Sequence, residues 1–196
     1  LHVRSRRQRQ MCIRDRHRGA ALQAAAAPVR QWLWPAQEPA PAGAGRLRSR
    51  QPVAAVIGLD TNVLARYFVE EADADAATEA QRQAARQLIE SGQDLFLPKT
   101  VALELEWVLR GYYGFAVESV LQVFEQLLHH PCISVDDRPD LEQALAGLRS
   151  GLDFADALHH ASCRDCEVIA SFDDRGFARR IRQLNLPPPV VVPTAR

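Results

Sequence analysis

Short apolar runs alternate with longer amphipathic segments from residue 53 to the end of the chain. The apolar runs are rich in Val, Ile and Leu and predict buried strands, because a strand covered on both faces is hydrophobic at consecutive positions. The segments between them place apolar residues three and four positions apart, the spacing of an amphipathic helix. The predicted strands cover residues 53–59, 94–98, 132–135, 167–172 and 190–192. The predicted helices cover residues 61–70, 78–92, 100–110, 116–130, 138–149, 153–165 and 175–184, with Thr100 as the N-cap of the third.

Strands that alternate with helices predict an α/β fold, with helices on both faces of a parallel sheet. We expect an α/β/α sandwich around a central, mostly parallel sheet of four to five strands. In such sheets, ligands bind beyond the carboxyl ends of the strands. Asp60 follows the first predicted strand and Asp173 follows the fourth, so both residues are expected at that edge.

Residues 1–50 differ in composition from the rest of the chain. They contain Arg-rich, Ala-rich and Pro/Gly-rich stretches without sustained apolar periodicity, a pattern that predicts disorder. Residues 11–16 resemble translated sequencing-adapter DNA, so the segment is interpreted as a disordered basic extension or as the result of a mis-assigned start. A basic arm that binds nucleic acid is the functional alternative. Residues 51–196 are expected to form one folded domain.

The net charge of zero conceals two segments of opposite charge. Residues 1–50 hold 11 arginines against Asp15 and Glu38, a net charge of +9. The whole chain has 24 basic and 24 acidic residues, so the remaining 13 basic and 22 acidic residues give residues 51–196 a net charge of −9. An acidic domain repels nucleic acid until cations neutralise its carboxylates, so any binding of RNA should depend strongly on metal and salt.

The four cysteines are too few for a disulfide scaffold and predict reduced thiols in a cytoplasmic protein. No apolar stretch approaches the roughly 20 residues needed to span a bilayer, and no convincing export signal is present. His159 and His160 could form a zinc site with Cys163 and Cys166. Structural zinc sites usually draw paired ligands from separate elements, so buried thiols and a partly exposed histidine are the simpler interpretation.

Four acidic residues are candidate metal ligands: Asp60, Glu104, Asp156 and Asp173. Carboxylates that are held close together raise one another's pKa unless a cation neutralises them. Mg²⁺ and Mn²⁺ are the natural occupants of such a site, because they are hard cations that prefer oxygen ligands. The four residues therefore predict an enzyme that uses a divalent metal.

Two neighbouring glutamates on the helix at 100–110 receive different interpretations. Glu104 lies about 40° from Val108, at the edge of the apolar stripe of this helix, where an unpaired carboxylate is costly. Glu106 lies on the far face with Arg110, four residues later. We expect Glu106 and Arg110 to form a solvated surface pair.

The other acidic neighbours are explained by helix capping. Asp153 is either an N-cap or a member of the site, and the sequence leaves both possibilities open. Asp173 is expected to face the site, with Asp174 as the cap of the following helix. A basic run follows and either contacts phosphate or forms a solvated helix face, which is the simpler interpretation. It consists of Arg175, Arg179, Arg180 and Arg182.

Four short motifs follow one another along the chain: Leu59-Asp60-Thr61-Asn62, Leu103-Glu104-Leu105-Glu106-Trp107-Val108-Leu109, Asp153-Phe154-Ala155-Asp156-Ala157-Leu158 and Ser171-Phe172-Asp173. In this order and spacing, they resemble the motifs of PIN-domain ribonucleases. The nearest likeness is to the VapC-like toxins of bacterial type II toxin–antitoxin pairs. The resemblance covers roughly residues 55–193.

This resemblance implies a PIN-like nuclease domain over residues 51–196. It also implies a metal-dependent endoribonuclease that hydrolyses RNA phosphodiester bonds and acts as a toxin. Its partners would be an RNA substrate, a cognate antitoxin protein and a second copy of the chain, without association with a membrane. The catalytic residues and ligands of Mg²⁺ or Mn²⁺ would be Asp60, Glu104, Asp156 and Asp173, supported by Asn62 and Ser171.

Two other classes of protein remain as alternatives. A phosphatase of the haloacid-dehalogenase kind also begins with an Asp after a strand, but it needs a second acid two residues later. Here that position is Asn62, and Lys99 is the only lysine in the chain. The second alternative is a non-enzymatic or housekeeping PIN-like module for RNA processing or interaction. The presence of all four acidic residues argues against this alternative.

Overall fold

A computed structural model describes residues 56–194, in which short parallel strands alternate with helices. The strands are β1 (Ile57–Gly58), β2 (Leu95–Leu97), β3 (Ile133–Val135), β4 (Ile169–Ala170) and β5 (Val190–Val191). The α-helices are α1 (Thr61–Phe68), α2 (Ala76–Ile89), α3 (Lys99–Trp107), α4 (Val117–His129), α5 (Arg138–Arg149), α6 (Phe154–Ser162) and α7 (Arg179–Leu184). Two π-helical turns extend them, η2 (Val108–Tyr112) after α3 and η3 (Asp174–Ala178) before α7. The predictions for residues 1–50 lie outside the described residues.

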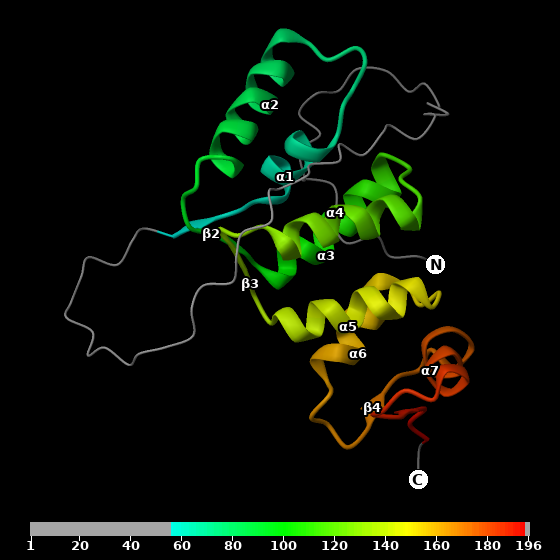
Figure 1. The fold of residues 1–196 in the computed structure, drawn as a ribbon. Helices are drawn as coiled ribbons and strands as arrows, with labels where there is room; N and C mark the ends of the chain where they lie inside the picture. The colour runs from blue at the N-terminus through cyan, green and yellow to red at the C-terminus, as the bar shows by residue number, and fades with distance from the viewer. Residues whose placement is uncertain (1–55, 195–196) are drawn as a thin grey trace, which may run out of the picture.

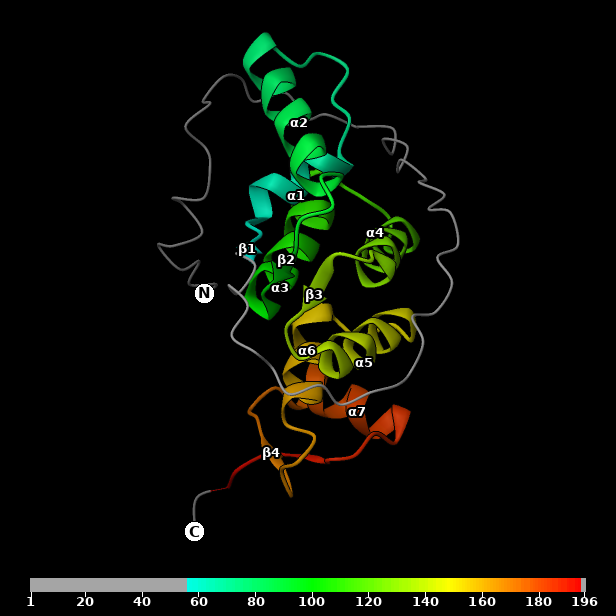
Figure 2. The same cartoon turned by 60° about the vertical axis from the view of Figure 1, so that its left-hand side comes forward.

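The strands form two parallel sheets, which confirms the α/β class but not the arrangement of a single sheet. One sheet has the order β1-β2-β3 and the other pairs β4 with β5. Helices α5 and α6 lie between the two sheets (Figures 1 and 2). The prediction of one central sheet of four to five strands is therefore wrong for residues 56–194. The physical reason is that β1 and β4 have only two residues each. β1 pairs with β2 and β4 pairs with β5, so no ladder joins the two sheets.

Helices cover the three-stranded sheet on both sides. Figure 2 shows α3 to one side of β2 and β3 and α4 to the other. The α4 side chain Phe124 stacks on Phe154 of α6, with ring centroids 5.5 Å apart, and both side chains are fully buried. Complete burial of a side chain of this size stabilises the fold by about 1.5–3 kcal/mol. Among residues 56–194, no helix combines the length and apolar character that a membrane span requires.

Helices α2 and α3 begin at residues other than the predicted ones because of the residues that cap them. Helix α2 begins two residues earlier than expected because the Asp75 carboxylate accepts a hydrogen bond from the Thr78 backbone N–H, at 2.7 Å. Thr100 is not the cap of α3, since Pro98 occupies the N-cap position and Thr100 lies inside the helix. Proline favours the extended conformation that precedes a helix, so α3 begins directly after β2.

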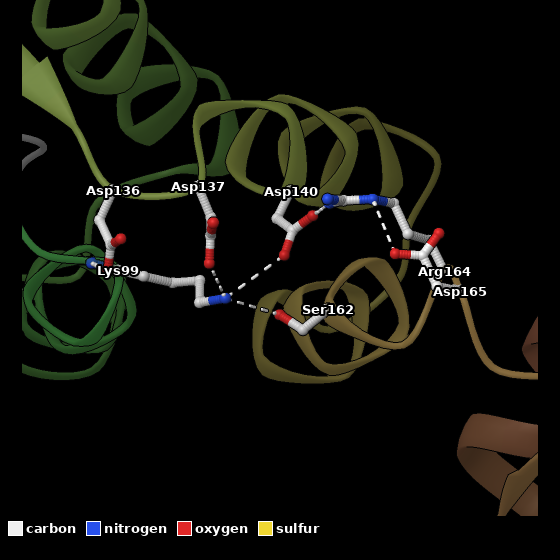
Figure 3. Close-up of polar contacts among 7 residues, drawn as sticks. All are labelled: Lys99, Asp136, Asp137, Asp140, Ser162, Arg164 and Asp165. Atoms are coloured by element: carbon white, nitrogen blue, oxygen red, sulfur yellow. Dashed lines mark hydrogen bonds and ion pairs between the residues drawn. The ribbon is translucent and has the colours of Figure 1, made fainter.

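A cluster of charged residues joins the start of α3 to α5 and α6 (Figure 3). The Lys99 ammonium donates to Asp137 Oδ2 at 2.6 Å, Asp140 Oδ2 at 3.3 Å and Ser162 Oγ at 3.2 Å. The hydrogen bond from Lys99 lowers the pKa of Asp137 below its usual range. Asp140 is only 3% exposed and also pairs with Arg164. We call this group the Lys99 cluster, and it connects the helices that carry Glu104 and Asp156.

Gly147 lets α5 and α6 approach closely. A Cβ at this position would lie 2.9 Å from Ala157 Cβ and 3.0 Å from Leu152 Cδ1. We predict that Gly147→Ala lowers the free energy of unfolding by about 1–2 kcal/mol, because overpacking outweighs the higher helix propensity of alanine. Urea unfolding measures this loss. Gly111→Ala is the matched control, since its Cβ would meet only the Trp107 ring at 3.4 Å or more. Equal stability of the two variants would contradict the prediction.

Candidate active site

The first two candidate ligands lie where α1 contacts α3. Asp60 precedes α1, and its exposed carboxylate does not cap the helix. Instead, it accepts a hydrogen bond from Asn62 Nδ2 at 3.1 Å. The hydroxyl of Thr61 donates to Glu104 Oε2 at 2.7 Å. The motif at the start of α1 therefore supplies one carboxylate and orients a second one on α3.

The other two candidates lie at the start of α6 and of η3. The Asp153 carboxylate caps α6 by accepting hydrogen bonds from the backbone N–H groups of Ala155 and Asp156, at 3.0 and 3.4 Å. Burial, followed by the charges of Asp153 and Asp173, raises the pKa of the half-buried Asp156 carboxyl. These three acids are thus close enough for their charges to interact. Asp153 is the N-cap that the sequence left as one of two possibilities.

Asp173, and not Asp174, is the N-cap of η3. The Asp173 carboxylate accepts hydrogen bonds from the backbone N–H groups of Gly176 (2.9 Å) and Phe177 (3.0 Å). These bonds lower the pKa of Asp173. Asp174 instead pairs with Arg182 at 2.5 Å, so the prediction that Asp174 is the cap was wrong. The Ser171 hydroxyl accepts a hydrogen bond from the Asp173 backbone N–H at 3.1 Å.

Glu106 is buried, contrary to the prediction of a solvated pair. Its bond with Arg110 is present, at 3.0 Å, but the Glu106 residue is only 7% exposed. Burial raises the pKa of Glu106, the hydrogen bond and charge of Arg110 oppose this rise, and the charge of Asp153 adds to it. The reason for the error is that α3 also contacts α6, which covers a face that helical spacing alone assigns to solvent.

The residues considered for zinc have other surroundings. His160 is 2% exposed, and its Nε2 lies 2.9 Å from the carbonyl oxygen of Pro188. The partly exposed histidine that was expected is therefore not His160, whereas His159 is exposed. Cys163 is half-buried and Cys166 is exposed, which corrects the expectation of buried thiols.

The four candidate ligands form two pairs, joined by α3. Helix α3 carries Glu104 and contacts both α1 and α6, so it links the Asp60–Glu104 pair to the Asp156–Asp173 pair. Among residues 56–194, no three or more His, Cys, Asp or Glu side chains are grouped closely enough to hold a metal ion. The carboxylate oxygens of these residues suit a hard cation. In the described residues, however, the four carboxylates do not form one metal centre.

Removal of the Asp156 charge is expected to stabilise the fold. The pKa of Asp156 is raised in the folded protein, so the folded state binds its proton more tightly and stability falls as the pH rises through that pKa. We predict that Asp156→Asn raises the free energy of unfolding by about 0.5–1 kcal/mol at about pH 7.

Thermal unfolding in the presence of a chelator measures this gain. The gain should vanish when the pH falls below the ordinary carboxyl range, where Asp156 is protonated in both states. Asp94→Asn, at an exposed position before β2, is the control for loss of one charge. A less stable Asp156→Asn at neutral pH would contradict the prediction.

The chain matches the sequence model of a known protein family. The model of the PIN domain matches residues 57–182, more than half of the chain, and this span contains both pairs of candidate ligands. The chain belongs to the PIN-domain family, as its motifs predicted. It is also similar to a VapC ribonuclease of Aquifex aeolicus (strain VF5), with 28% identity over 131 residues, which cover 64% of this chain and 90% of that protein.

Proposed function

We propose that this protein is a metal-dependent endoribonuclease and the toxin of a toxin–antitoxin pair. The observation that carries the proposal is the PIN-domain match over residues 57–182, because all four candidate ligands lie inside it. The similarity to a VapC ribonuclease supports both the substrate class and the role as a toxin.

The proposed cofactor is Mg²⁺ or Mn²⁺, held by Asp60, Glu104, Asp156 and Asp173. Their chemistry supports this assignment, because carboxylate oxygens suit these cations and the raised pKa of Asp156 reflects burial together with negative charge nearby. Binding by all four requires the two carboxylate pairs to approach each other. When bound, such a cation lowers the pKa of a water molecule and neutralises charge on the phosphate.

The supporting side chains would fix the carboxylates before RNA binds. Asn62 holds Asp60, Thr61 holds Glu104, and Ser171 holds the backbone of Asp173. A carboxylate with a fixed direction loses less conformational entropy when it acts. The Thr61 hydroxyl donates to Glu104, but Thr61 is only 4% exposed. Its hydroxyl is therefore not open to a substrate, and water is the simpler nucleophile.

The partners follow from the proposed role. We expect an RNA substrate, single-stranded or looped, whose cleavage leaves a 5′-phosphate. We also expect a cognate antitoxin protein that occludes the site, a homodimer and a cytoplasmic location. A neighbouring reading frame that encodes a small DNA-binding protein would support the toxin role.

The direct test is cleavage of RNA by the full chain with and without Mg²⁺ or Mn²⁺. We expect cleavage that stops when a chelator is added and returns when either metal is restored. Cleavage that continues undiminished in the chelator would contradict the proposed mechanism.

A second function is favoured because, among residues 56–194, no three His, Cys, Asp or Glu side chains are grouped closely enough to hold a metal ion. A non-enzymatic PIN-like module would bind RNA or protein without cleaving it. Retention of labelled RNA with no cleavage in either metal would select this alternative.

A further inference from the structure

A shallow basic hollow lies beside the candidate site, on η3 and α7. Its volume is about 460 Å³, and it is lined by Asp174, Arg175, Arg179, Arg182 and Gln183. We call it the arginine hollow.

The cations of the arginine hollow are only partly neutralised. Arg182 pairs with Asp174 at 2.5 Å, whereas Arg175 and Arg179 take part in none of the ion pairs formed among residues 56–194. Three arginines gathered in one hollow are notable in a domain whose net charge is −9. They create a local positive field that attracts anions.

An exposed aromatic ring precedes the arginine hollow in sequence. Phe172 is 81% exposed, the highest value among the exposed large hydrophobic residues of the described chain. Leaving such a side chain in water forgoes about 1.5–3 kcal/mol of burial energy. It directly precedes Asp173, and the next residue, Asp174, lines the arginine hollow. The exposed ring and the candidate ligand therefore lie within two residues of the arginine hollow along the chain.

Basic grooves combined with exposed aromatic rings are typical of surfaces that bind single-stranded nucleic acid. Cationic side chains contact successive phosphates, and a ring stacks on a base of any identity. We propose that the arginine hollow and Phe172 bind single-stranded RNA next to Asp173. Arg175 and Arg179 contact its phosphates, and Phe172 stacks on one base. The inference rests on the proposed function in taking RNA as the substrate.

The same surface could attract other partners. An acidic protein segment would also suit the arginines. A second copy of the chain could cover Phe172 together with the exposed side chains of Val168, Val191 and Val192. Charge complementarity between the arginines and phosphate, together with a ring that can stack on a base, favours RNA. Binding experiments distinguish these occupants.

The phosphate contacts are tested by the salt dependence of RNA binding. The full chain carrying Asp60→Asn, to prevent cleavage, is titrated against fluorescently labelled single-stranded RNA. Adding Arg175→Gln and Arg179→Gln together should weaken binding about tenfold near 0.15 M salt. It should also reduce the slope of log K against log salt by about 1.4, or 0.7 for each phosphate contact. Arg149→Gln, at an exposed position on α5, should leave the slope unchanged.

The stacking contact is tested by substitution of the ring. Phe172→Leu should weaken RNA binding about tenfold without changing the salt slope, because stacking involves no phosphate charge. Phe172→Trp should restore the affinity. Tyr112→Leu, at a residue that is 67% exposed on η2, should bind RNA as the parent protein does.

Binding of RNA that is unchanged by both sets of substitutions would overturn the inference. So would a loss of dimer in Phe172→Leu at constant RNA affinity, which would assign the surface to a second copy. If the substituted chains bind an acidic peptide more weakly than the parent chain but bind RNA equally well, the surface would be assigned to a protein partner. These outcomes leave the proposed function untouched, whereas its own failure is the absence of metal-dependent RNA cleavage by the unsubstituted chain.

Discussion

Asp60→Asn is expected to slow metal-dependent RNA cleavage by about 100- to 1,000-fold, the effect of removing one preorganised electrostatic group. The side chain of Asp60 is exposed and does not cap α1. Its replacement should therefore leave the fold intact, because the amide keeps the shape of the carboxylate while removing its charge. The measurement is the initial rate of RNA cleavage in Mg²⁺ and in Mn²⁺.

Asp94→Asn is the matched control for this rate. Asp94 is also exposed and lies directly before β2, beside the start of β1, whereas Asp60 follows the end of β1. The control should cleave at the parental rate. Equal rates for Asp60→Asn and the parent protein would exclude Asp60 from the reaction.

Lys99→Met is expected to lower the free energy of unfolding by about 3 kcal/mol, the largest effect on stability that we predict. The substitution leaves the Asp140 carboxylate, whose side chain is 4% exposed, without its Lys99 partner. A buried charge that loses its partner is costly because water does not replace the lost interaction. Arg164 still pairs with Asp140, which places the loss at the lower end of the range for buried pairs. Urea unfolding measures it.

Arg138→Met provides the contrast. Arg138 pairs with Glu142 at 2.7 Å, but both side chains are about half exposed, at 48% and 50%. A surface pair of this kind contributes about 0.3–0.5 kcal/mol. In addition, Asp140→Asn should reduce the cost of Lys99→Met, because the two substitutions remove the same interaction. Similar losses for Lys99→Met and Arg138→Met would show that burial adds nothing to the Lys99 cluster.

Helices were predicted well where their own residues determine the boundaries. The predicted helix at 138–149 coincides with α5, and the one at 116–130 exceeds α4 by one residue at each end. In both, apolar spacing identifies the buried face, and local signals set the ends. The N-cap of α2 was missed, although Asp75 three residues before Thr78 is a recognisable capping pattern.

Features that depend on contacts distant in sequence were predicted poorly. Periodicity identifies a strand but does not reveal its neighbour, so the division between β1-β2-β3 and β4-β5 could not be predicted. Glu106 is buried by the approach of α6, which spacing along α3 does not indicate. Asp173 and Asp174 both suit a helix start, and only the geometry of η3 shows that Asp173 is the cap.

The candidate site shows the same limit. Four acids at the ends of strands and on helices were recognisable from the sequence, and the family match includes them all. The contacts of Asn62 and Ser171 with their neighbouring acids could be expected from their positions two residues away. How near the Asp60–Glu104 pair lies to the Asp156–Asp173 pair depends on the packing of α3 against α1 and α6, which the sequence pattern does not specify.

Whether all four carboxylates bind one metal is tested most directly by titration with Mn²⁺, followed by the electron paramagnetic resonance signal of the free ion. Full-length parent protein is compared with Asp60→Asn, Glu104→Gln, Asp156→Asn and Asp173→Asn, and with Asp94→Asn as control. If the four side chains share one metal centre, each of the four substitutions weakens Mn²⁺ binding by at least about tenfold, and the control binds like the parent. Mn²⁺ affinity that is unchanged by substitutions in either carboxylate pair would contradict a single site built from all four.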